Sequence, residues 1–334
     1  MRFILGLFVI AFSVPAHADW HVAESDNFVI YADDQAKDLQ AFGEALESYN
    51  AALNLLSKRE ATKPSPSNRL TIFVVGSQNE IGKLADDKSK TIAGFYIPRA
   101  GSSVAFVPDI RMRGRETDWS MTVLLHEYAH HFLIASSRFA MPRWMDEGGA
   151  EFFASARFPR NGEVHIGRPA YHRSAELAFA PEVSMDELFE RGKFTVGGSR
   201  SRDDFYGRSW ALYHYLTFDP DRKGQLLGYA RRIAAGEASI DAAHAEFGEL
   251  RALGKDLDRY LMKRKLSGFV LQPNLLPIKP ISVERLSDGM DAMLPVMIRS
   301  KRGVDEDTAA EVLIDAREVA ALYPNDAGVQ AALA

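Results

Sequence analysis

The feature that constrains this chain most is the pentapeptide His126-Glu127-Tyr128-Ala129-His130, which fits the pattern H-E-x-x-H. Residues four apart on a helix lie one above the other on the same face, so His126 and His130 can hold one metal ion from one side. Imidazole nitrogen is a good zinc ligand, and Glu127 can reach a water on that ion and take its proton. Because three fixed residues also match by chance, the flanking sequence has to decide.

The residues around the pentapeptide are apolar, with Val123-Leu124-Leu125 before it and Phe132-Leu133-Ile134 after it. They predict a largely buried helix, in which two histidines and a glutamate need polar partners. One interpretation is a core helix whose histidines make ordinary hydrogen bonds. A metal site is favoured because a second acidic cluster follows, where a third ligand is needed.

That second cluster runs from Trp144 to Phe153, and Pro142 suits the start of a helix just before it. Glu147 and Glu151 are again four residues apart, so one can ligate the metal while the other orients a ligand histidine. The intervening loop, residues 135–141, is long enough to turn the chain back. The two helices can then face each other across an ion, with the roles of the two glutamates left open by spacing alone.

These two stretches resemble the gluzincin zinc metallopeptidases, the peptidase MA-like superfamily of thermolysin and aminopeptidase N. Trp144, Glu147, Gly148 and Ala150 match the W-x-x-E-G-x-A pattern of the aminopeptidase-N branch. The nearest pattern is the W-[LM]-x-E-G-x-A-E-[FY]-F signature of poorly characterised bacterial members. The resemblance is strong over residues 123–153 and thin elsewhere.

The resemblance implies a role for each residue of the cluster. One Zn²⁺ ion would be held by His126, His130 and Glu147, with Glu127 as the general base. An acidic residue four positions after the ligand glutamate hydrogen-bonds a ligand histidine in thermolysin-like members, and Glu151 occupies that place. No other cofactor is implied.

A tyrosine opens a Y-x-K-G helix about sixty residues beyond the ligand glutamate in the aminopeptidase-N branch, where its hydroxyl helps to bind the oxyanion. Tyr206 matches that position by resemblance, although Gly207-Arg208-Ser209 departs from the rest of the motif. We expect Tyr206 to be a catalytic oxyanion donor, since such a donor is worth several kcal/mol. The alternative is a packed aromatic residue at a helix start. His214, further along the same helix, has no acidic partner at ligand spacing and is expected to be a core histidine.

The first 18 residues are typical of a secretory signal peptide. Arg2 is a basic start, residues 3–14 are apolar but too short for a membrane span, and Ala16-His17-Ala18 fits an A-x-A cleavage site. We expect a mature chain that begins at Asp19 and is periplasmic or secreted, the alternative being an N-terminal anchor. No later stretch predicts a membrane span.

The composition limits the partners. The chain has no cysteine, so the core must stabilise it without disulfides. Its net charge of −5, with both signs interspersed, argues against nucleic acid, which would favour a basic patch. The expected partner is a peptide or protein substrate.

The predicted fold is α+β, with a zincin-like peptidase domain. Residues 19–115 form a small N-terminal α/β sheet unit, residues 116–270 a helical zinc-binding catalytic half, and residues 271–334 a short helical C-terminal extension. The extension holds two helices with weak tetratricopeptide-like character. It either covers apolar surface or binds a protein partner.

The apolar pattern of the first unit is specific enough to place its elements. In gluzincins the sheet before the metal helix offers its edge strand to an extended peptide, and we expect that edge to be one of the last two strands. The pattern predicts an extended segment over 21–32, a helix over 35–57, strands over 70–75, 94–97 and 104–107, and a short helix over 78–84.

Together these features predict an exported zinc metallopeptidase that uses a metal-activated water and a glutamate base. The G-x-M-E-N motif with which aminopeptidase-N relatives bind a free amino terminus is absent, so an aminopeptidase is not expected. An alternative is a catalytically silent metal-binding or interaction module on the same fold, although such a module would not need Glu127. A hydrolase of non-peptide amides in the cell wall is the third possibility.

Overall fold

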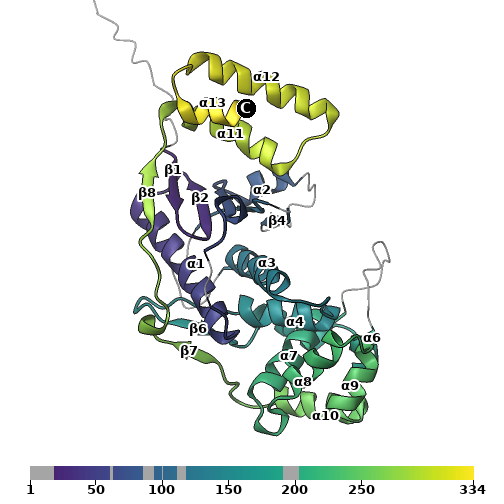
Figure 1. Ribbon diagram of the computed structural model, residues 1–334. Helices are drawn as coiled ribbons and strands as arrows, with labels where there is room; N and C mark the ends of the chain where they lie inside the picture. Colours follow the sequence, from purple (N-terminus) through teal and green to yellow (C-terminus); the bar gives the residue numbers. More distant parts are fainter. Residues whose placement is uncertain (1–18, 61–62, 86–93, 100, 111–117, 191–202) are drawn as a thin grey trace, which may run out of the picture.

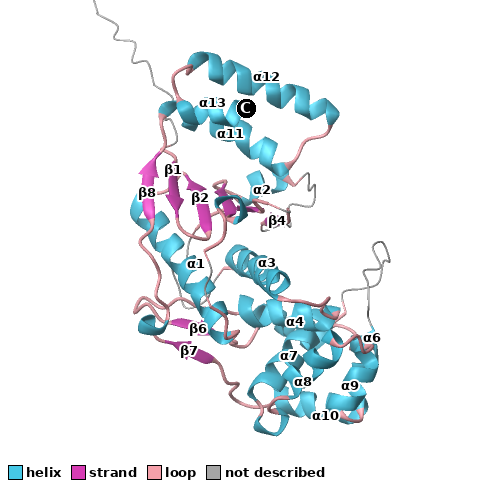
Figure 2. Ribbon diagram, in the orientation of Figure 1, coloured by secondary structure: helices cyan, strands magenta, loops and turns pink. Residues whose placement is uncertain are grey.

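A computed structural model of the protein describes residues 19–60, 63–85, 94–99, 101–110, 118–190 and 203–334. The predicted signal peptide lies outside these ranges. The chain has the predicted α+β composition, with helices on both sides of one mixed sheet and a separate group of helices beyond it (Figures 1 and 2). Among the described residues, no helix combines the length and apolar character that a membrane span requires.

The main sheet has six strands in the order β4-β5-β3-β2-β1-β8. Its centre is parallel, because β2 pairs in parallel with β3 and β3 with β5. The other three pairings are antiparallel. The strand order places β4 and β8 at the two edges. The strands are β1 (His21–Glu24), β2 (Phe28–Ala32), β3 (Leu70–Val74), β4 (Phe95–Ile97), β5 (Val104–Val107) and β8 (Ser282–Arg285).

The predicted elements of the first unit are confirmed, and the predicted extended segment is a hairpin of β1 and β2. One of the two strands expected at an edge, β4, is an edge strand. The first helices are α1 (Ala36–Leu56), α2 (Gln78–Leu84), α3 (Trp119–Ser136) and α4 (Arg143–Ala154). The later ones are α5 (Ser174–Phe179), α6 (Met185–Glu190), α7 (Phe205–Phe218), α8 (Gln225–Ala234), α9 (Ser239–Phe247), α10 (Leu250–Leu261), α11 (Asp288–Arg302), α12 (Glu306–Leu322) and α13 (Ala327–Leu333).

Alternation along the strands sends apolar side chains to both faces of the sheet. Ile72 and Val74 of β3 belong to the core that includes α1 and α3. Phe73, between them, packs in a separate cluster with Ile81 of α2 and Leu294 of α11. Both faces are therefore covered, and α11 lies on the face opposite α3 (Figure 1).

The C-terminal region departs from the prediction of two helices alone. It contributes the strand β8 and then three helices, α11, α12 and α13. Before β8, the strand β7 (Phe269–Leu271) pairs with β6 (Val164–Ile166), which follows α4. The segment between β7 and β8 runs alongside α1, where Ile281 lies against Gly43 (Figure 1). The C-terminal residues are thus tied to both the sheet and the helical half.

Two tyrosines fix the position of α3 under the sheet. Tyr49 of α1 donates a hydrogen bond to the Leu125 carbonyl at 3.1 Å, and Tyr128 of α3 donates to Asn50 Oδ1 at 3.0 Å. The helix begins at a true cap, because Asp118 Oδ1 accepts from the Met121 amide at 2.8 Å. These contacts hold the H-E-x-x-H face of α3 at a defined angle to α1.

Helix α4 is held by close packing against α7. A Cβ atom on Gly148 would lie 2.4 Å from the Ser209 carbonyl oxygen, so only glycine permits this approach of the two backbones. On another side of α4, buried Trp144 donates to Tyr229 Oη at 2.9 Å. The first residue of the W-x-x-E-G pattern therefore anchors α4 to α8.

The prediction for His214 of α7 is confirmed, because it is fully buried and hydrogen-bonded as a neutral imidazole. Its Nδ1 accepts from Tyr260 Oη at 2.8 Å, and its Nε2 donates to the Gly167 carbonyl at 3.0 Å. Burial lowers the pKa of His214 to about 4, and the hydrogen bonds of Nε2 with the Ser267 and Gly167 carbonyls only partly oppose this. The imidazole is therefore neutral in the folded chain at neutral pH.

We expect His214 to make folding sensitive to mild acid. The pKa of His214 in the folded chain lies below its unfolded value near 6.5. The stability that the neutral imidazole contributes is therefore fully present above pH 6.5 and is lost as the pH falls towards 4. The loss can reach about 3 kcal/mol. His214→Gln keeps a donor and an acceptor but cannot be protonated in this range, so its free energy of unfolding should fall less over that window. Urea unfolding at a series of pH values measures this.

The matched control is His244→Gln on α9, where the histidine is exposed. This variant should follow the parent across the whole pH range. Parallel curves for the parent and His214→Gln would contradict the expectation.

Candidate metal centre

Three side chains from α3 and α4 converge on one point, as the sequence predicts. His126 Nε2 and His130 Nε2 lie 3.0 Å apart. Glu147 Oε2 lies 3.2 Å from His130 Nε2 and 3.4 Å from His126 Nε2. The group is largely buried, and its ligand atoms all fall within 4.8 Å of one another. These three residues could hold one metal ion.

The outer nitrogen of each histidine faces a carboxylate. His126 Nδ1 lies 3.2 Å from Glu151 Oε1, and His130 Nδ1 lies 3.0 Å from Asp146 Oδ1. Because an ionised carboxylate only accepts, each Nδ1 carries the proton. In the neutral tautomer each Nε2 then presents a lone pair to the other Nε2 and to Glu147. Three electron-rich atoms at this separation need a cation between them.

The spacing of the three donors suits a zinc ion. Zinc binds histidine nitrogen and carboxylate oxygen at roughly 2.0–2.2 Å in a tetrahedron, which places neighbouring ligands roughly 3.3 Å apart. The observed separations of 3.0, 3.2 and 3.4 Å match that edge length. The residues present therefore fit the predicted group, both in donor chemistry and in geometry.

The ionisation of the group shows how strongly it attracts positive charge. Burial alone would lower the pKa of His126, but hydrogen bonds with Glu147 and Glu151 outweigh it and raise the pKa to about 9. Burial is likewise outweighed at His130, whose pKa rises to about 10 through Asp146 and Glu147. The Glu147 pKa falls to about 2 against the effect of its burial, because of the two histidines. Protons and a metal ion thus compete for the same place.

Glu151 lies in a hydrogen-bond network that the sequence does not predict. It is almost completely buried and bonds His126, as the resemblance implies. It also accepts from His172 Nε2 at 2.6 Å and from Arg173 Nη2. These partners hold the Glu151 pKa well below its usual range, despite burial. Glu151 therefore remains a charged acceptor that fixes the His126 ring.

Glu127 is half-buried beside the metal group. Burial raises the pKa of its carboxyl, and the neighbouring His126 and His130 counteract this. A carboxylate with a raised pKa is a better proton acceptor near neutral pH. The position is consistent with the predicted base.

Tyr206 lies close to the same centre, at the start of α7. Burial and the nearby negative charge of Glu147 raise the pKa of its phenol, while Arg143 and Arg173 oppose this. Arg143 Nη2 donates to Tyr206 Oη at 3.4 Å, and the Arg173 guanidinium lies 4.7 Å from the centre of the Tyr206 ring. The structure therefore brings Tyr206 to the site, and its predicted role as an oxyanion donor stays a prediction.

The edge strand β4 is connected to α3 next to the three converging side chains. Tyr96 Oη and His131 Nδ1 lie 3.0 Å apart. Burial raises the pKa of the Tyr96 phenol, and the nearby charge of Glu127 raises it further. His131 is thus occupied by Tyr96 and is not one of the three converging donors. This contact fixes the distance between the edge strand β4 and α3.

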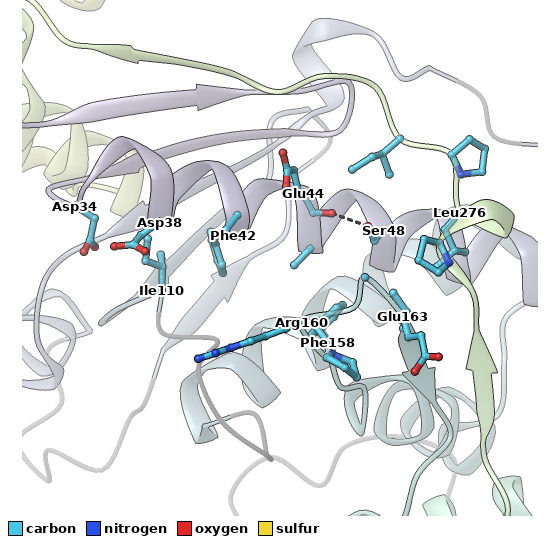
Figure 3. Close-up of a pocket in the computed structure, with 18 residues that line it drawn as sticks. Asp34, Asp38, Phe42, Glu44, Ser48, Ile110, Phe158, Arg160, Glu163 and Leu276 are labelled. Atoms are coloured by element: carbon cyan, nitrogen blue, oxygen red, sulfur yellow. Dashed lines mark hydrogen bonds between the residues drawn. The ribbon is translucent and has the colours of Figure 1, made fainter.

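A groove of about 820 Å³ is found elsewhere on the molecule, along α1. Figure 3 shows Asp38, Phe42 and Ser48 along the helix, with Phe158 and Arg160 on the opposite side. None of the residues predicted for the metal site lines it. The three converging side chains and this groove are therefore in different places.

Sequence reasoning missed four residues of the site. Asp146 and Arg143 carried a signal, because one precedes Glu147 directly and the other lies four residues before it on the same helix face. His172 and Arg173 come from a segment after α4 with no fixed spacing to it, so no local pattern could have found them.

No protein-family model and no curated protein matches the sequence.

Proposed function

We propose that the chain is an exported zinc metallopeptidase of the gluzincin type with a zincin-like catalytic domain. The observation that carries this proposal is the convergence of His126, His130 and Glu147, with a carboxylate behind each histidine. An ordinary core helix gives no reason for two imidazole Nε2 atoms and a carboxylate oxygen to point at one another. The adjacent Glu127 favours a catalytic centre over a storage site.

The roles of the residues follow from their positions. His126, His130 and Glu147 would hold the ion, and a zinc ion held there would lower the pKa of a water and polarise a carbonyl. Glu127 accepts the proton of the attacking water on its carboxylate and returns it to the leaving amine. Tyr206 donates its hydroxyl proton in a hydrogen bond to the developing oxyanion.

A peptide is the substrate that the surroundings favour. Among the strands of the described residues, β4 lies at an edge of the sheet, and it is tied to α3 by the contact between Tyr96 and His131. An extended peptide can add to such an edge as a further strand, which brings one of its peptide bonds towards Glu127. The absence of an amino-terminus motif favours an endopeptidase.

The proposal is tested by metal analysis together with proteolysis. We expect purified mature protein to contain one zinc ion per chain and to cleave an unfolded protein such as reduced casein. Treatment with 1,10-phenanthroline should abolish cleavage, and added zinc should restore it, because the chelator removes the ion that would activate the water.

Other results would point elsewhere. One zinc ion without cleavage of any of several unfolded proteins would favour the interaction module. Cleavage of peptidoglycan amides alone would favour the cell-wall hydrolase. Cleavage that persists in metal-free protein would overturn the proposal.

A further inference from the structure

Three charged residues lie on one stripe of α4, at four-residue intervals. Arg143, Glu147 and Glu151 share the helix face that points to α3. The two glutamates account for the metal and for the orientation of His126. Arg143 lies at the first turn of the same helix.

The contacts of Arg143 place its guanidinium between a metal ligand and Tyr206. Its Nη2 donates to Tyr206 Oη at 3.4 Å, and its Nε lies 4.0 Å from Glu147 Oε1. The guanidinium carbon also lies 4.4 Å from the ring centre of Phe205, which holds the side chain over the start of α7. Glu147 meets the histidines through its other oxygen, Oε2.

The packing of α4 on α7 makes this contact reproducible. Arg143 meets Phe205 and Tyr206, Gly148 meets Ser209, and Phe152 meets Tyr213, so the two helices run side by side in the same direction. A glycine at the crossing point fixes their separation. The packing of α4 against α7 therefore holds the Arg143 guanidinium next to the Tyr206 hydroxyl.

We propose that Arg143 is a positioning residue for Tyr206, and that the two side chains act as one unit on negative charge that develops at the metal centre. The Tyr206 oxygen accepts from Arg143, so its own proton is left to donate towards the site. A guanidinium keeps its charge at any working pH and strengthens the phenol as a donor. This inference rests on the proposed peptidase function.

The test is a double-mutant cycle on the zinc-loaded full mature chain. The variants are Arg143→Gln, Arg143→Lys, Tyr206→Phe and the double variant Arg143→Gln/Tyr206→Phe. Each is assayed for zinc content, for kcat and KM on an internally quenched peptide, and for the Kd of the phosphoramidate dipeptide N-phosphoryl-Leu-Trp. The probe carries a tetrahedral anion, so its binding reports on the pair without turnover.

A second arginine–tyrosine pair, formed by Tyr215 of α7 and Arg222 just after that helix, offers a matched control. Arg222 Nε donates to Tyr215 Oη at 3.0 Å, and its guanidinium lies 5.4 Å from the centre of that ring. This pair is joined to Asp256 of α10 and takes no part in the metal group. Arg222→Gln removes an equivalent arginine–tyrosine contact and should leave kcat, KM and probe affinity unchanged.

The expected pattern is strong coupling. Arg143→Gln and Tyr206→Phe should each lower kcat about 100-fold, with KM within about threefold of the parent. The double variant should also lose about 100-fold, not the roughly 10⁴-fold of independent effects. Arg143→Lys should lower kcat about tenfold, because lysine keeps the positive charge but lacks the planar set of N–H donors of a guanidinium. Probe affinity should fall at least about tenfold in both single variants, with one zinc ion in each.

Several results would overturn the inference. Additive losses would show that the two side chains act independently, and a rise in KM alone would assign Arg143 to ground-state binding. Loss of zinc in Arg143→Gln would show that it acts through Glu147, and a parent that does not bind the probe would also exclude the role. A zinc-loaded parent that binds the probe but cleaves no peptide would contradict the proposed function alone, and the probe affinities would still decide the role of Arg143.

Discussion

Glu127→Gln is expected to lower kcat for peptide cleavage by about 10³-fold while one zinc ion per chain remains bound. Glutamine has nearly the same shape as glutamate but cannot accept a proton. Glu127 is not among the three converging donors, so the ion should be retained. Burial raises the pKa of its carboxyl, which makes it a better proton acceptor near neutral pH. Single-turnover cleavage with matched zinc analysis measures both quantities.

The control makes the same chemical change at an exposed place. Glu318 lies on α12, on the other side of the sheet from α3, and Glu318→Gln should have the activity of the parent. Zinc lost from Glu127→Gln would make Glu127 a ligand instead of a base. Full activity in Glu127→Gln, with zinc in place, would remove the base from the proposed mechanism.

The metal group could be predicted because each of its halves is local. Ligand spacing on a helix is fixed by 3.6 residues per turn, so His126 and His130 on α3 define one half of the site from sequence alone. Glu147 and Glu151 define the other half in the same way. What the spacing could not supply is the orientation of each pair, which depends on how α3 and α4 pack. The structure supplies it through Tyr49, Tyr128 and the close contact at Gly148.

The strand β8 could not be predicted for a different reason. Three of its four residues are exposed, so Ser282–Arg285 shows no alternation of apolar and polar side chains. It is a strand only because Val283 and its neighbours pair with β1, which is far away in sequence. The short strand β7 depends in the same way on β6. Pairing partners this far apart in the sequence leave no periodic pattern of apolar residues. The extension also has three helices where two were predicted.

The two glutamates of α4 present the same limit at the site itself. Spacing leaves either Glu147 or Glu151 free to be the third ligand, and the family resemblance favours Glu147. The structure separates them by their partners. Glu147 Oε2 faces both Nε2 atoms, whereas Glu151 meets only an Nδ1 and is further bonded by His172 and Arg173. A carboxylate already bonded by three cationic or polar groups is poorly placed to take a metal ion as well.

We therefore expect Glu147→Gln and Glu151→Gln to differ sharply, although they make the same change on the same face of α4. Loss of one of three protein donors removes about a third of a binding free energy of about 12 kcal/mol, which weakens zinc binding by about 10³-fold. Loss of the carboxylate behind His126 should weaken it by about 10–100-fold. Competition with a chelator of known zinc affinity measures both constants, and thermal unfolding checks that each variant folds. The reverse order of affinities would assign the metal to Glu151 and leave Glu147 as the residue that orients the histidines.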